Sequence, residues 1–392
     1  MLSPESAAVV RASLPVIGGA IEDIAARFYA TMFAEHPELQ RNLFNRGNQA
    51  NGEQRSALAG SIAAFAGLLV ERPGERPEAM LSRIANKHAS LGVTPDQYEI
   101  VRKYLFAAIV DVLGEAVTPE VASAWDEVYQ LMADALIALE TDLGEPGDHW
   151  TVATVLSRRA ESAETISVTL RPPVMLPFRP GQYISVAVTL PDGARQIRQY
   201  SLSRSPERGD LRITVKRAGG GDDPEGEVSN WLHANLREGD QLTISRPFGD
   251  LTLSPGDTPL LLASAGIGVT PILSMVDHLV ATRSTRQVTV VHADRTAADH
   301  AHREELTRLV DALPRGVLHR WYEESCDCDC RPAPRTGLVD LSEIDLPART
   351  VAYLCGPLPF MRGLRSQLLR RGVPGSDIHY EVFGPDLWLG RD

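Results

Sequence analysis

The sequence predicts a multidomain protein, in which an all-α domain is followed by an antiparallel β-barrel domain and an α/β domain with a parallel sheet. Three observations predict this order. Apolar residues recur at helical spacing up to about residue 145, alternate with a period of two from about 150 to 250, and then fall into strands and helices in turn. A chain of 392 residues has room for two or three ordinary domains. We therefore expect domains at 1–146, 147–256 and 257–392.

In the first domain, amphipathic stripes are separated by prolines and glycines. The stripes lie within residues 21–32, 58–69, 81–91, 98–109 and 121–139. An apolar residue at every third or fourth position is typical of the buried face of a helix. The segment Gly-Glu-Pro-Gly at 144–147 is predicted to be a linker.

The second and third domains are predicted from their strands. In the second, short alternating strands are expected at 151–157, 165–170, 183–189, 199–202, 211–216 and 241–245, with one helix at 229–236. Such strands between turn residues are typical of an antiparallel barrel. In the third, strands at 259–264, 287–292, 350–354 and 378–383 alternate with helices at 270–281, 300–313 and 360–371. That alternation predicts a parallel sheet covered by helices.

The composition is that of an ordinary globular protein, with 43% hydrophobic and 23% charged residues. The formal net charge of −12 and the lack of a basic block disfavour nucleic acid or an anionic membrane as a partner. No apolar run reaches the roughly 18 residues of a membrane span, and no secretory signal is visible. With four cysteines and no disulfide pattern, we expect a cytoplasmic protein. We also expect a monomer.

Four polar residues occupy apolar stripes of the first domain, namely Tyr29, Gln54, His88 and Glu140. Buried polar groups need partners, and any one of these residues alone is more often a satisfied core residue than part of a site. Four of them in one small all-α domain favour a site. A buried neutral histidine is also a good axial ligand for haem iron.

The segments RFYATMF (27–33), LFN (43–45), NQANGEQR (48–55) and NKHASLG (86–92) closely resemble the globin domain of bacterial flavohaemoglobins, and the resemblance continues through the whole chain. It implies that His88 is the proximal ligand of a b-type haem. The other haem-site residues that it implies are Tyr29 and Gln54 on the distal face, Phe44 and Leu58 packed on the haem, and Tyr98, Glu140 and Lys87 around the proximal histidine.

These residue types agree with redox chemistry. A carboxylate that accepts the second ring N–H of a histidine ligand fixes the imidazole and makes it more electron-donating. A phenol and an amide on the opposite face can donate hydrogen bonds to bound oxygen. Simple oxygen storage needs reversible binding rather than this donation of electron density, so the set favours an oxidoreductase.

The tetrapeptide RQYS at 198–201, which follows RPGQY at 179–183, resembles the flavin signature of the ferredoxin reductase superfamily. An aromatic ring suits stacking on an isoalloxazine, and an arginine suits a phosphate. RQYS alone is equally typical of an ordinary strand, but its spacing before GEVSN at 226–230 favours FAD. A helix beginning near residue 229 can direct backbone N–H groups at the pyrophosphate.

The resemblance implies that Tyr200 and Ser201 contact the isoalloxazine, that Arg198 contacts a phosphate and that Tyr183 lies on the adenine side. The terminal segment YEVFGP (380–385) resembles the family segment that places an aromatic residue, here Phe383, against the isoalloxazine. The remaining implied FAD residues are Gln199, Gly226, Val228, Ser229, Glu381, Val382, Gly384 and Pro385. Val382 departs from the family, which often has cysteine there.

The segment SAGIGVTP (264–271) follows an apolar strand and opens a helix. Its glycines allow close approach of a phosphate, and we expect Thr270 to cap the helix, with Pro271 as the first helical residue. Such a segment alone marks a simple turn about as often as a site. Together with Cys-Gly-Pro at 355–357 it resembles the family's nucleotide domain. The implied NAD(P) residues are Gly266, Ile267, Gly268, Val269, Thr270, Pro271, Cys355, Gly356 and Pro357.

The segment ESCDCDCRPAPR departs from the family. Cys326, Cys328 and Cys330 alternate with aspartates, and such thiols can hold a soft metal. The C-x-C-x-C spacing is not one of the usual zinc patterns, so an exposed loop without metal is favoured.

The resemblance implies a nitric oxide dioxygenase, which converts NO and O2 into nitrate with electrons from NAD(P)H that pass through FAD to haem. Two other readings stay open. One is a haem and flavin reductase of hydroperoxides, and the other is an O2 or NO carrier or sensor with a self-reducing module. NADH and NADPH both remain candidates, because Arg295 can meet a 2′-phosphate or can simply be a solvated surface residue.

Overall fold

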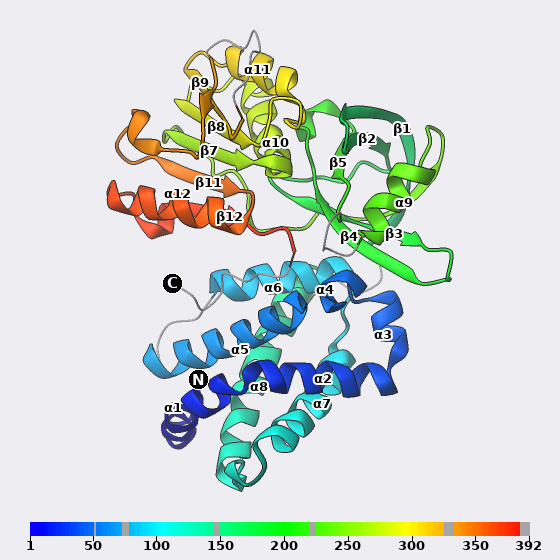
Figure 1. Cartoon of the computed structure of the whole chain (residues 1–392), viewed down its shortest axis with the longest axis vertical. Helices are drawn as coiled ribbons and strands as arrows, with labels where there is room; N and C mark the ends of the chain where they lie inside the picture. The colour runs from blue at the N-terminus through cyan, green and yellow to red at the C-terminus, as the bar shows by residue number, and fades with distance from the viewer. Residues whose placement is uncertain (51, 73–77, 145–148, 220–224, 325–332, 385–392) are drawn as a thin grey trace.

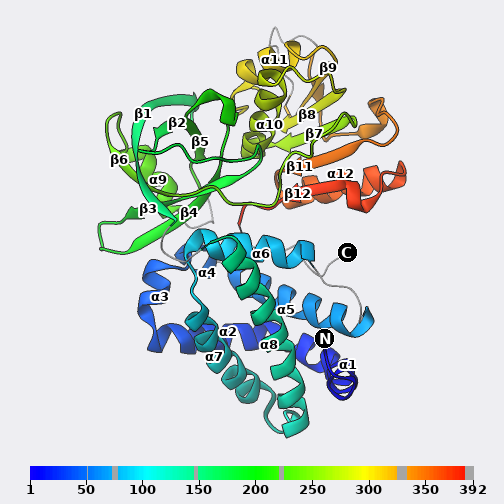
Figure 2. The ribbon, with the colours of Figure 1, turned by 180° about the vertical axis from the view of Figure 1, so that it is seen from behind.

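The computed structural model describes residues 1–50, 52–72, 78–144, 149–219, 225–324 and 333–384. Figure 1 shows a helical domain below, and two sheet-containing domains side by side above it. The view from behind in Figure 2 shows the same arrangement, with α6 and α4 on the side of the helical domain that faces β3 and β4. The predicted fold class, three domains in this order, is confirmed.

The helical domain contains α1 to α8. Their bounds are α1 Pro4–Gly19, α2 Ile21–Glu35, α3 Pro37–Asn42, α4 Arg46–Ala50, α5 Glu53–Glu71, α6 Glu78–Leu91, α7 Pro95–Leu113 and α8 Pro119–Asp142. Proline is the first residue of several of these helices, where its missing N–H costs nothing. Thr94 and Gln97 form a reciprocal capping box that fixes the start of α7.

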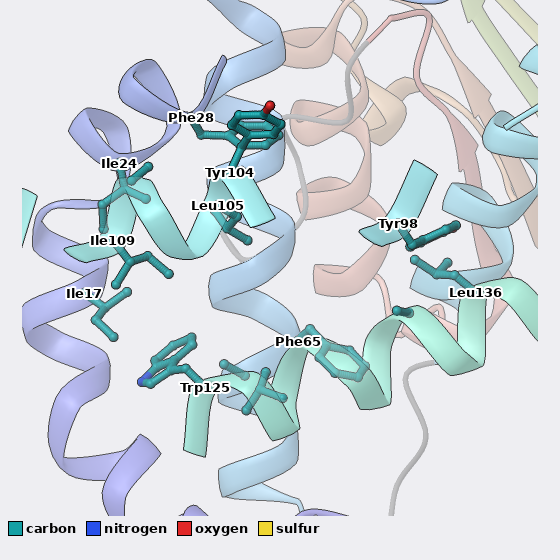
Figure 3. Packing of buried hydrophobic residues seen from close by; sticks show 14 of the residues in the cluster. Ile17, Ile24, Phe28, Phe65, Tyr98, Tyr104, Leu105, Ile109, Trp125 and Leu136 are labelled. Carbon is teal, nitrogen blue, oxygen red and sulfur yellow. The ribbon is translucent and has the colours of Figure 1, made fainter. Parts of the chain in front are cut away.

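The apolar stripes of these helices meet in one core, because α2 packs on α7 while α8 packs on α1 and α6. Figure 3 shows Ile17, Ile109 and Trp125 gathered at one end of this core. Tyr98 and Leu136 lie beside each other at the other end. That second end adjoins the residues that carry the candidate site.

The second domain is a six-stranded antiparallel sheet in the order β4-β3-β6-β1-β2-β5. Its elements are β1 Trp150–Ser162, β2 Thr165–Arg171, β3 Tyr183–Thr189, β4 Arg195–Ser201, β5 Leu211–Lys216, α9 Glu227–Asn235 and β6 Gln241–Ser245. A bridge between Leu202 and Ile213 joins the two edge strands at one end, which closes the sheet into a barrel there. The predicted bounds of β3, β5 and β6 are confirmed.

The third domain is a parallel sheet in the order β10-β9-β8-β7-β11-β12. Its elements are β7 Leu260–Ala265, α10 Val269–Ala281, β8 Val288–Asp294, α11 Arg303–Asp311, β9 Gly316–Tyr322, β10 Arg335–Thr336, β11 Val351–Cys355, α12 Leu358–Arg370 and β12 Ile378–Glu381. Alternate residues of β7 and β8 point into two separate cores. One core contains α10 and α11 and the other contains α12, so helices cover both faces. Short 3-10 turns lie at Gly114–Ala116, Pro206–Arg208, Gly266–Gly268, Leu341–Glu343 and Gly375–Asp377.

Several predicted bounds differ from the structure. Strand β4 begins at Arg195 rather than at residue 199, because its polar first half pairs with the end of β3. The predicted helix at 300–313 begins only at Arg303, since His302 has φ +58° and lies outside helical geometry. Strands β9 and β10 were not predicted, and Arg320, a buried charged residue, interrupts the apolar pattern of β9.

Within the described residues, no helix has both the length and the hydropathy required to cross a membrane.

Candidate functional site

A single cavity of about 700 Å³ extends across the three domains. Its helical walls come from α2, α5, α6, α7 and α8, and its other walls come from β3, β4, the start of α9, the turn before α10 and the segment after β12. The side chains in the helical part are mostly apolar, among them Phe28, Met32, Leu43 and Leu136. Of the four polar residues singled out from the sequence, Tyr29, Gln54 and His88 line this cavity.

His88, on α6, lines the cavity. Two oxygen groups, a hydroxyl and a carboxylate, contact its ring nitrogen Nδ1. Its Nδ1 lies 2.9 Å from the Tyr98 hydroxyl and 2.9 Å from Oε1 of Glu140. The Tyr98 hydroxyl also donates to Glu140 Oε1 over 2.5 Å. Burial and the Glu140 charge raise the pKa of Tyr98, so the phenol keeps its proton and remains a donor.

Both of these contacts use Nδ1, so Nε2 is the His88 ring nitrogen that remains for a metal among the described residues. A carboxylate on the second nitrogen is the arrangement that orients histidine ligands of metals. Tyr98 is itself fixed by Tyr129, whose hydroxyl donates to the Tyr98 carbonyl over 2.6 Å. The structure thus brings His88 into contact with Tyr98, 10 positions away in the chain, and with Glu140, 52 positions away.

Tyr29, on α2, lines the same cavity, and its side chain is buried. Its ring centroid is 5.5 Å from that of Phe33 and 5.9 Å from that of Phe44. Burial raises the pKa of Tyr29, and the amides of Gln54 and Gln49 oppose the shift. The phenol is therefore protonated and can donate a hydrogen bond into the cavity. Leu58 lines the cavity as well.

Gln49 was missed by the sequence reasoning. Its Nε2 is buried and has no hydrogen-bond partner among the described residues. In the sequence, Gln49 is marked only by its position in the same polar segment as Gln54. That segment does not indicate which of the two amides lies near Tyr29.

The flavin-side residues lie on β4 and at the start of α9. Gln199, Tyr200 and Ser201 line the cavity together with Arg198, and burial raises the pKa of Tyr200. Arg198 Nη1 donates to Gln196 Oε1 over 3.1 Å and to the Ile197 carbonyl over 2.8 Å.

At the start of α9, Gly226 and Ser229 line the cavity, whereas Val228 is fully buried in the barrel core. A Cβ on Gly226 would lie 2.6 Å from both Ala218 Cβ and Ser229 Oγ, so only glycine fits. The turn thus leaves the N–H groups at the start of α9 close to the cavity, a position suited to a phosphate.

The proximal helix α6 also contacts the barrel. Lys87 Nζ donates to Gln199 Oε1 over 2.5 Å, and Gln199 Nε2 donates to Ser185 Oγ over 2.9 Å. Asn86 Oδ1 accepts from the Gly249 N–H over 2.8 Å. Burial lowers the pKa of Lys87 to about 8, although the Glu381 charge opposes the shift. Lys87 therefore lies between the helical domain and the flavin-side strand.

Tyr183 lies in the same interface, buried on β3. Burial and the charge of Glu381 raise its pKa, and Ser90 of α6 opposes the shift. A Cβ on Gly249 would lie 3.0 Å from the Tyr183 ring, so the loop after β6 packs closely on it.

In the third domain, β7 leads through the turn Gly266–Gly268 into α10. A Cβ on Gly268 would lie 2.2 Å from the Cys355 carbonyl oxygen, so this turn must pass very close to the end of β11. Ile267 and Thr270 line the cavity. The lining does not include Gly266, Gly268, Val269, Pro271, Cys355, Gly356 or Pro357.

The prediction that Thr270 caps α10 and that Pro271 is its first residue is wrong. The helix begins at Val269, with Gly268 at the capping position and no side-chain cap. The 3-10 turn continues directly into the helix, so the helix starts two residues earlier than the proline signal indicates. The Thr270 hydroxyl donates instead to the Ile267 carbonyl over 3.0 Å.

The segment after β12 closes the cavity with Glu381, Val382, Phe383 and Gly384. Phe383 is 46% exposed. Pro385 and the three clustered cysteines Cys326, Cys328 and Cys330 lie outside the described residues. Arg295 is exposed, and its Nη2 lies 3.5 Å from Asp299 Oδ1.

The donor set and the shape of the cavity fit two large planar groups. On the helical side, apolar walls, the available Nε2 of His88 and the phenol of Tyr29 fit a haem. On the barrel side, an aromatic residue and a hydroxyl on β4, Arg198 and the glycine turn before α9 fit a flavin dinucleotide. The residues that would hold the two groups line one cavity.

Three protein-family models match the chain. They are "Globin" over residues 26–136, "Oxidoreductase FAD-binding domain" over 153–253 and "Oxidoreductase NAD-binding domain" over 262–366. The expected cofactor set of haem, FAD and a pyridine nucleotide is confirmed at the level of these families.

Among curated proteins, the flavohemoprotein of Rhizobium meliloti (strain 1021) is 40% identical, and the alignment covers 99% of this chain and 100% of that protein. The flavohemoglobin of Malassezia yamatoensis, solved with bound FAD and heme, is similar in structure with a TM-score of 0.87 and 37% identity, covering 98% of this chain and 100% of that one.

The FAD/NAD binding domain of the nitric oxide dioxygenase from Vibrio cholerae is 36% identical with a TM-score of 0.56, covering 60% of this chain and 100% of that domain. Full-length identity at this level, three matching domains in the same order and a shared cavity between them lead to one conclusion: the chain belongs to the flavohemoprotein family and is an oxidoreductase in which a globin is joined to a flavin and pyridine-nucleotide reductase.

Proposed function

We propose that the protein is a nitric oxide dioxygenase that works as a cytoplasmic monomer. It consumes two NO and two O2 for each NAD(P)H and releases two nitrate ions, NAD(P)⁺ and one proton. The domains at 1–146, 147–256 and 257–392 take up haem, FAD and NAD(P)H respectively. The observation that carries this proposal is the Glu140–Tyr98–His88 contact, which lies in the same cavity as a flavin-side strand.

When bound, the haem supplies an iron that binds diatomic gases, and FAD converts a hydride into single electrons. The protein's own residues then have distinct tasks. His88 binds the iron through Nε2, while Glu140 and the Tyr98 hydroxyl hold Nδ1 and make the imidazole a stronger donor. That stronger donation favours oxidation chemistry over reversible storage.

On the distal side, Tyr29 donates a hydrogen bond toward the gas-binding position, and its raised pKa keeps the proton on the phenol. The amide of Gln54, which opposes the rise in the Tyr29 pKa, would orient that phenol. The apolar rings of Phe33 and Phe44 hold its position and exclude water.

On the reductase side, Tyr200 and Ser201 hold the isoalloxazine, and Arg198 with the start of α9 holds the pyrophosphate. Phe383, which lines the same cavity, would pack against the isoalloxazine. The close turn at Gly268, next to the end of β11, would bind the nucleotide. Lys87 and Gln199 bridge the two halves and keep the flavin next to the haem.

The deciding experiment measures NO consumption with an electrode while NAD(P)H, O2 and nitrate are quantified. NO loss must require both NAD(P)H and O2, and nitrate must appear in a one-to-one ratio with NO. Oxidation of NAD(P)H without NO loss rejects the proposal. If NAD(P)H oxidation instead depends on an added alkyl hydroperoxide, the protein is a hydroperoxide reductase. Running the assay with NADH and with NADPH also determines the preferred nucleotide.

A further inference from the structure

An arginine of the helical domain reaches across the interface to the start of α9. Arg46, the first residue of α4, donates from Nη2 to Glu227 Oε1 over 2.6 Å and from Nε to Glu227 Oε2 over 3.2 Å. Its Nη1 donates to Asp192 Oδ2 over 2.6 Å. One guanidinium therefore holds both oxygens of Glu227 and is itself anchored by Asp192, between β3 and β4. Two parallel bonds of this kind form the strongest type of arginine–carboxylate contact.

The partner of this arginine lies at the candidate pyrophosphate site. Glu227 is the first residue of α9 and follows the glycine turn at Gly226. Its side chain lines the same cavity as Arg198, and Arg198 Nη2 lies 3.9 Å from Glu227 Oε2. The carboxylate of Glu227 thus lies beside the groups that would bind phosphate.

A carboxylate in this place opposes a phosphate in two ways. The positive end of α9 and the cation of Arg198 are the natural partners of a pyrophosphate, which carries two negative charges. An unpaired Glu227 would repel those charges, and it would also draw Arg198 toward itself. Glu227 and Arg198 are both partly shielded from solvent, with 32% and 18% of their side chains exposed, so water screens this repulsion only in part.

We propose that Arg46 is a positioning residue for the flavin: by pairing with both oxygens of Glu227, it leaves Arg198 and the start of α9 available to the FAD pyrophosphate. Because α4 belongs to the helical domain, FAD affinity then depends on how the helical domain sits against the barrel. This inference rests on the proposed FAD site.

The test is a titration of FAD into full-length, haem-loaded protein from which flavin has been removed, followed by the quenching of flavin fluorescence. Arg46→Met keeps most of the side-chain stem but removes the charge. We expect FAD affinity to fall about tenfold, because the charge-assisted contact that is lost is partly exposed to water and therefore weaker than a buried one. Arg46→Lys keeps the charge but cannot bind both oxygens of Glu227 at once, so its FAD affinity should lie between those of the parent and Arg46→Met. The difference between parent and Arg46→Met should shrink at high salt.

Glu227→Gln supplies the decisive comparison. Removing the carboxylate should leave FAD affinity equal to the parent's or higher, and adding Arg46→Met to Glu227→Gln should cause no further loss. A merely structural role for Arg46 would instead give the same loss in both backgrounds. Haem content, read from the Soret band, should be unchanged throughout.

Arg41→Met is the matched control. Arg41 belongs to the neighbouring helix α3 and donates to the Asp192 carbonyl over 2.9 Å, so it crosses the same interface with the same charge. Among the residues that the structure describes, it forms no hydrogen bond or ion pair with Glu227. It should leave FAD affinity unchanged. Equal losses in Arg41→Met and Arg46→Met, or an Arg46→Met variant that binds FAD as tightly as the parent, overturn the inference. If the parent itself binds no FAD, the proposed function fails instead.

Discussion

At the scale of single residues, the candidate site depends on polar side chains whose protonation is fixed by burial. The pKa values of Tyr29, Tyr98 and Tyr200 are all raised mainly by burial, so each phenol stays a hydrogen-bond donor at neutral pH. Each one therefore provides a directed donor without adding a charge to an apolar cavity. Two substitutions test this picture directly.

Tyr29→Phe keeps the ring packing on Phe33 and Phe44 and removes only the hydroxyl. Haem content and thermal stability should hardly change. Losing a hydrogen bond of roughly 1.5–3 kcal/mol should speed O2 release about ten- to a hundred-fold. Stopped-flow measurement of O2 dissociation checks this expectation, and NO turnover at limiting O2 should fall in parallel. Unchanged O2 release would show that Tyr29 is a core residue only.

His88→Ala removes the proposed iron ligand but leaves the other two domains intact. Stable haem binding should be lost, while bound FAD and NAD(P)H-driven reduction of an artificial dye should persist. Soret absorbance and flavin content, measured on the same sample, check both halves of the expectation. A variant with full Soret absorbance and a histidine-ligated spectrum would contradict the ligand assignment.

At the scale of elements, α6 joins the two cofactor sites because its faces contact different domains. His88 faces the helical cavity, whereas Asn86 and Lys87 contact the barrel. Arg83 of the same helix lies over the ring of Tyr380, with its guanidinium carbon 4.2 Å from the ring centroid. A single helix thus fixes the position of the proposed iron ligand relative to all three domains.

The turn before α10 gives a prediction at the same scale. Gly268→Ala would place a Cβ 2.2 Å from the Cys355 carbonyl oxygen, a backbone atom that cannot move aside cheaply. We expect the turn to shift, with a loss of about 1–3 kcal/mol in stability and a clear rise in the KM for NAD(P)H. Haem and FAD content should not change.

Gly363→Ala is the control for this substitution. It lies inside α12, where an added Cβ meets no atom within 4 Å, so it should be neutral or slightly stabilising. Thermal unfolding and steady-state kinetics on both variants make the comparison. Equal KM values for the parent and Gly268→Ala would show that the close approach is unimportant for nucleotide binding.

At the scale of the whole molecule, the three domains are joined by polar contacts around one cavity. Lys87 is a partly buried charge in this interface, and desolvation lowers its pKa from 10.5 to about 8. A lysine with a lowered pKa binds its proton less tightly when folded than when unfolded. Its burial therefore costs most below pH 8. Between pH 8 and 10.5 the folded protein has released this proton while the unfolded chain still holds it, so the free energy of unfolding should rise with pH across that window.

Comparison of the parent with Lys87→Met across pH 7 to 10 isolates this contribution. The stability of the parent relative to the variant should rise with pH by about 1–3 kcal/mol over that window. Chemical denaturation at each pH measures the difference. A constant difference would show that Lys87 keeps an ordinary pKa in the interface.

By itself, the sequence determined what depends on neighbours along the chain. Helical stripes, alternating strands and the glycine turns at 226 and 268 follow from side-chain period and backbone sterics, which act locally. The bounds of β3, β5 and β6 could be predicted for that reason. The residues Tyr29, His88 and Glu140 could be singled out because each is a polar residue in an apolar stripe.

Only the tertiary structure decided which distant groups meet. It placed Gln49 near Tyr29, gave α10 its earlier start, and buried Arg320 in a strand that the apolar pattern does not mark. It also joined Arg46 to Glu227 across 181 positions of the chain. No local pattern encodes such a pair, because its energy arises only when the packed domains bring the two side chains within hydrogen-bonding distance and exclude water around them.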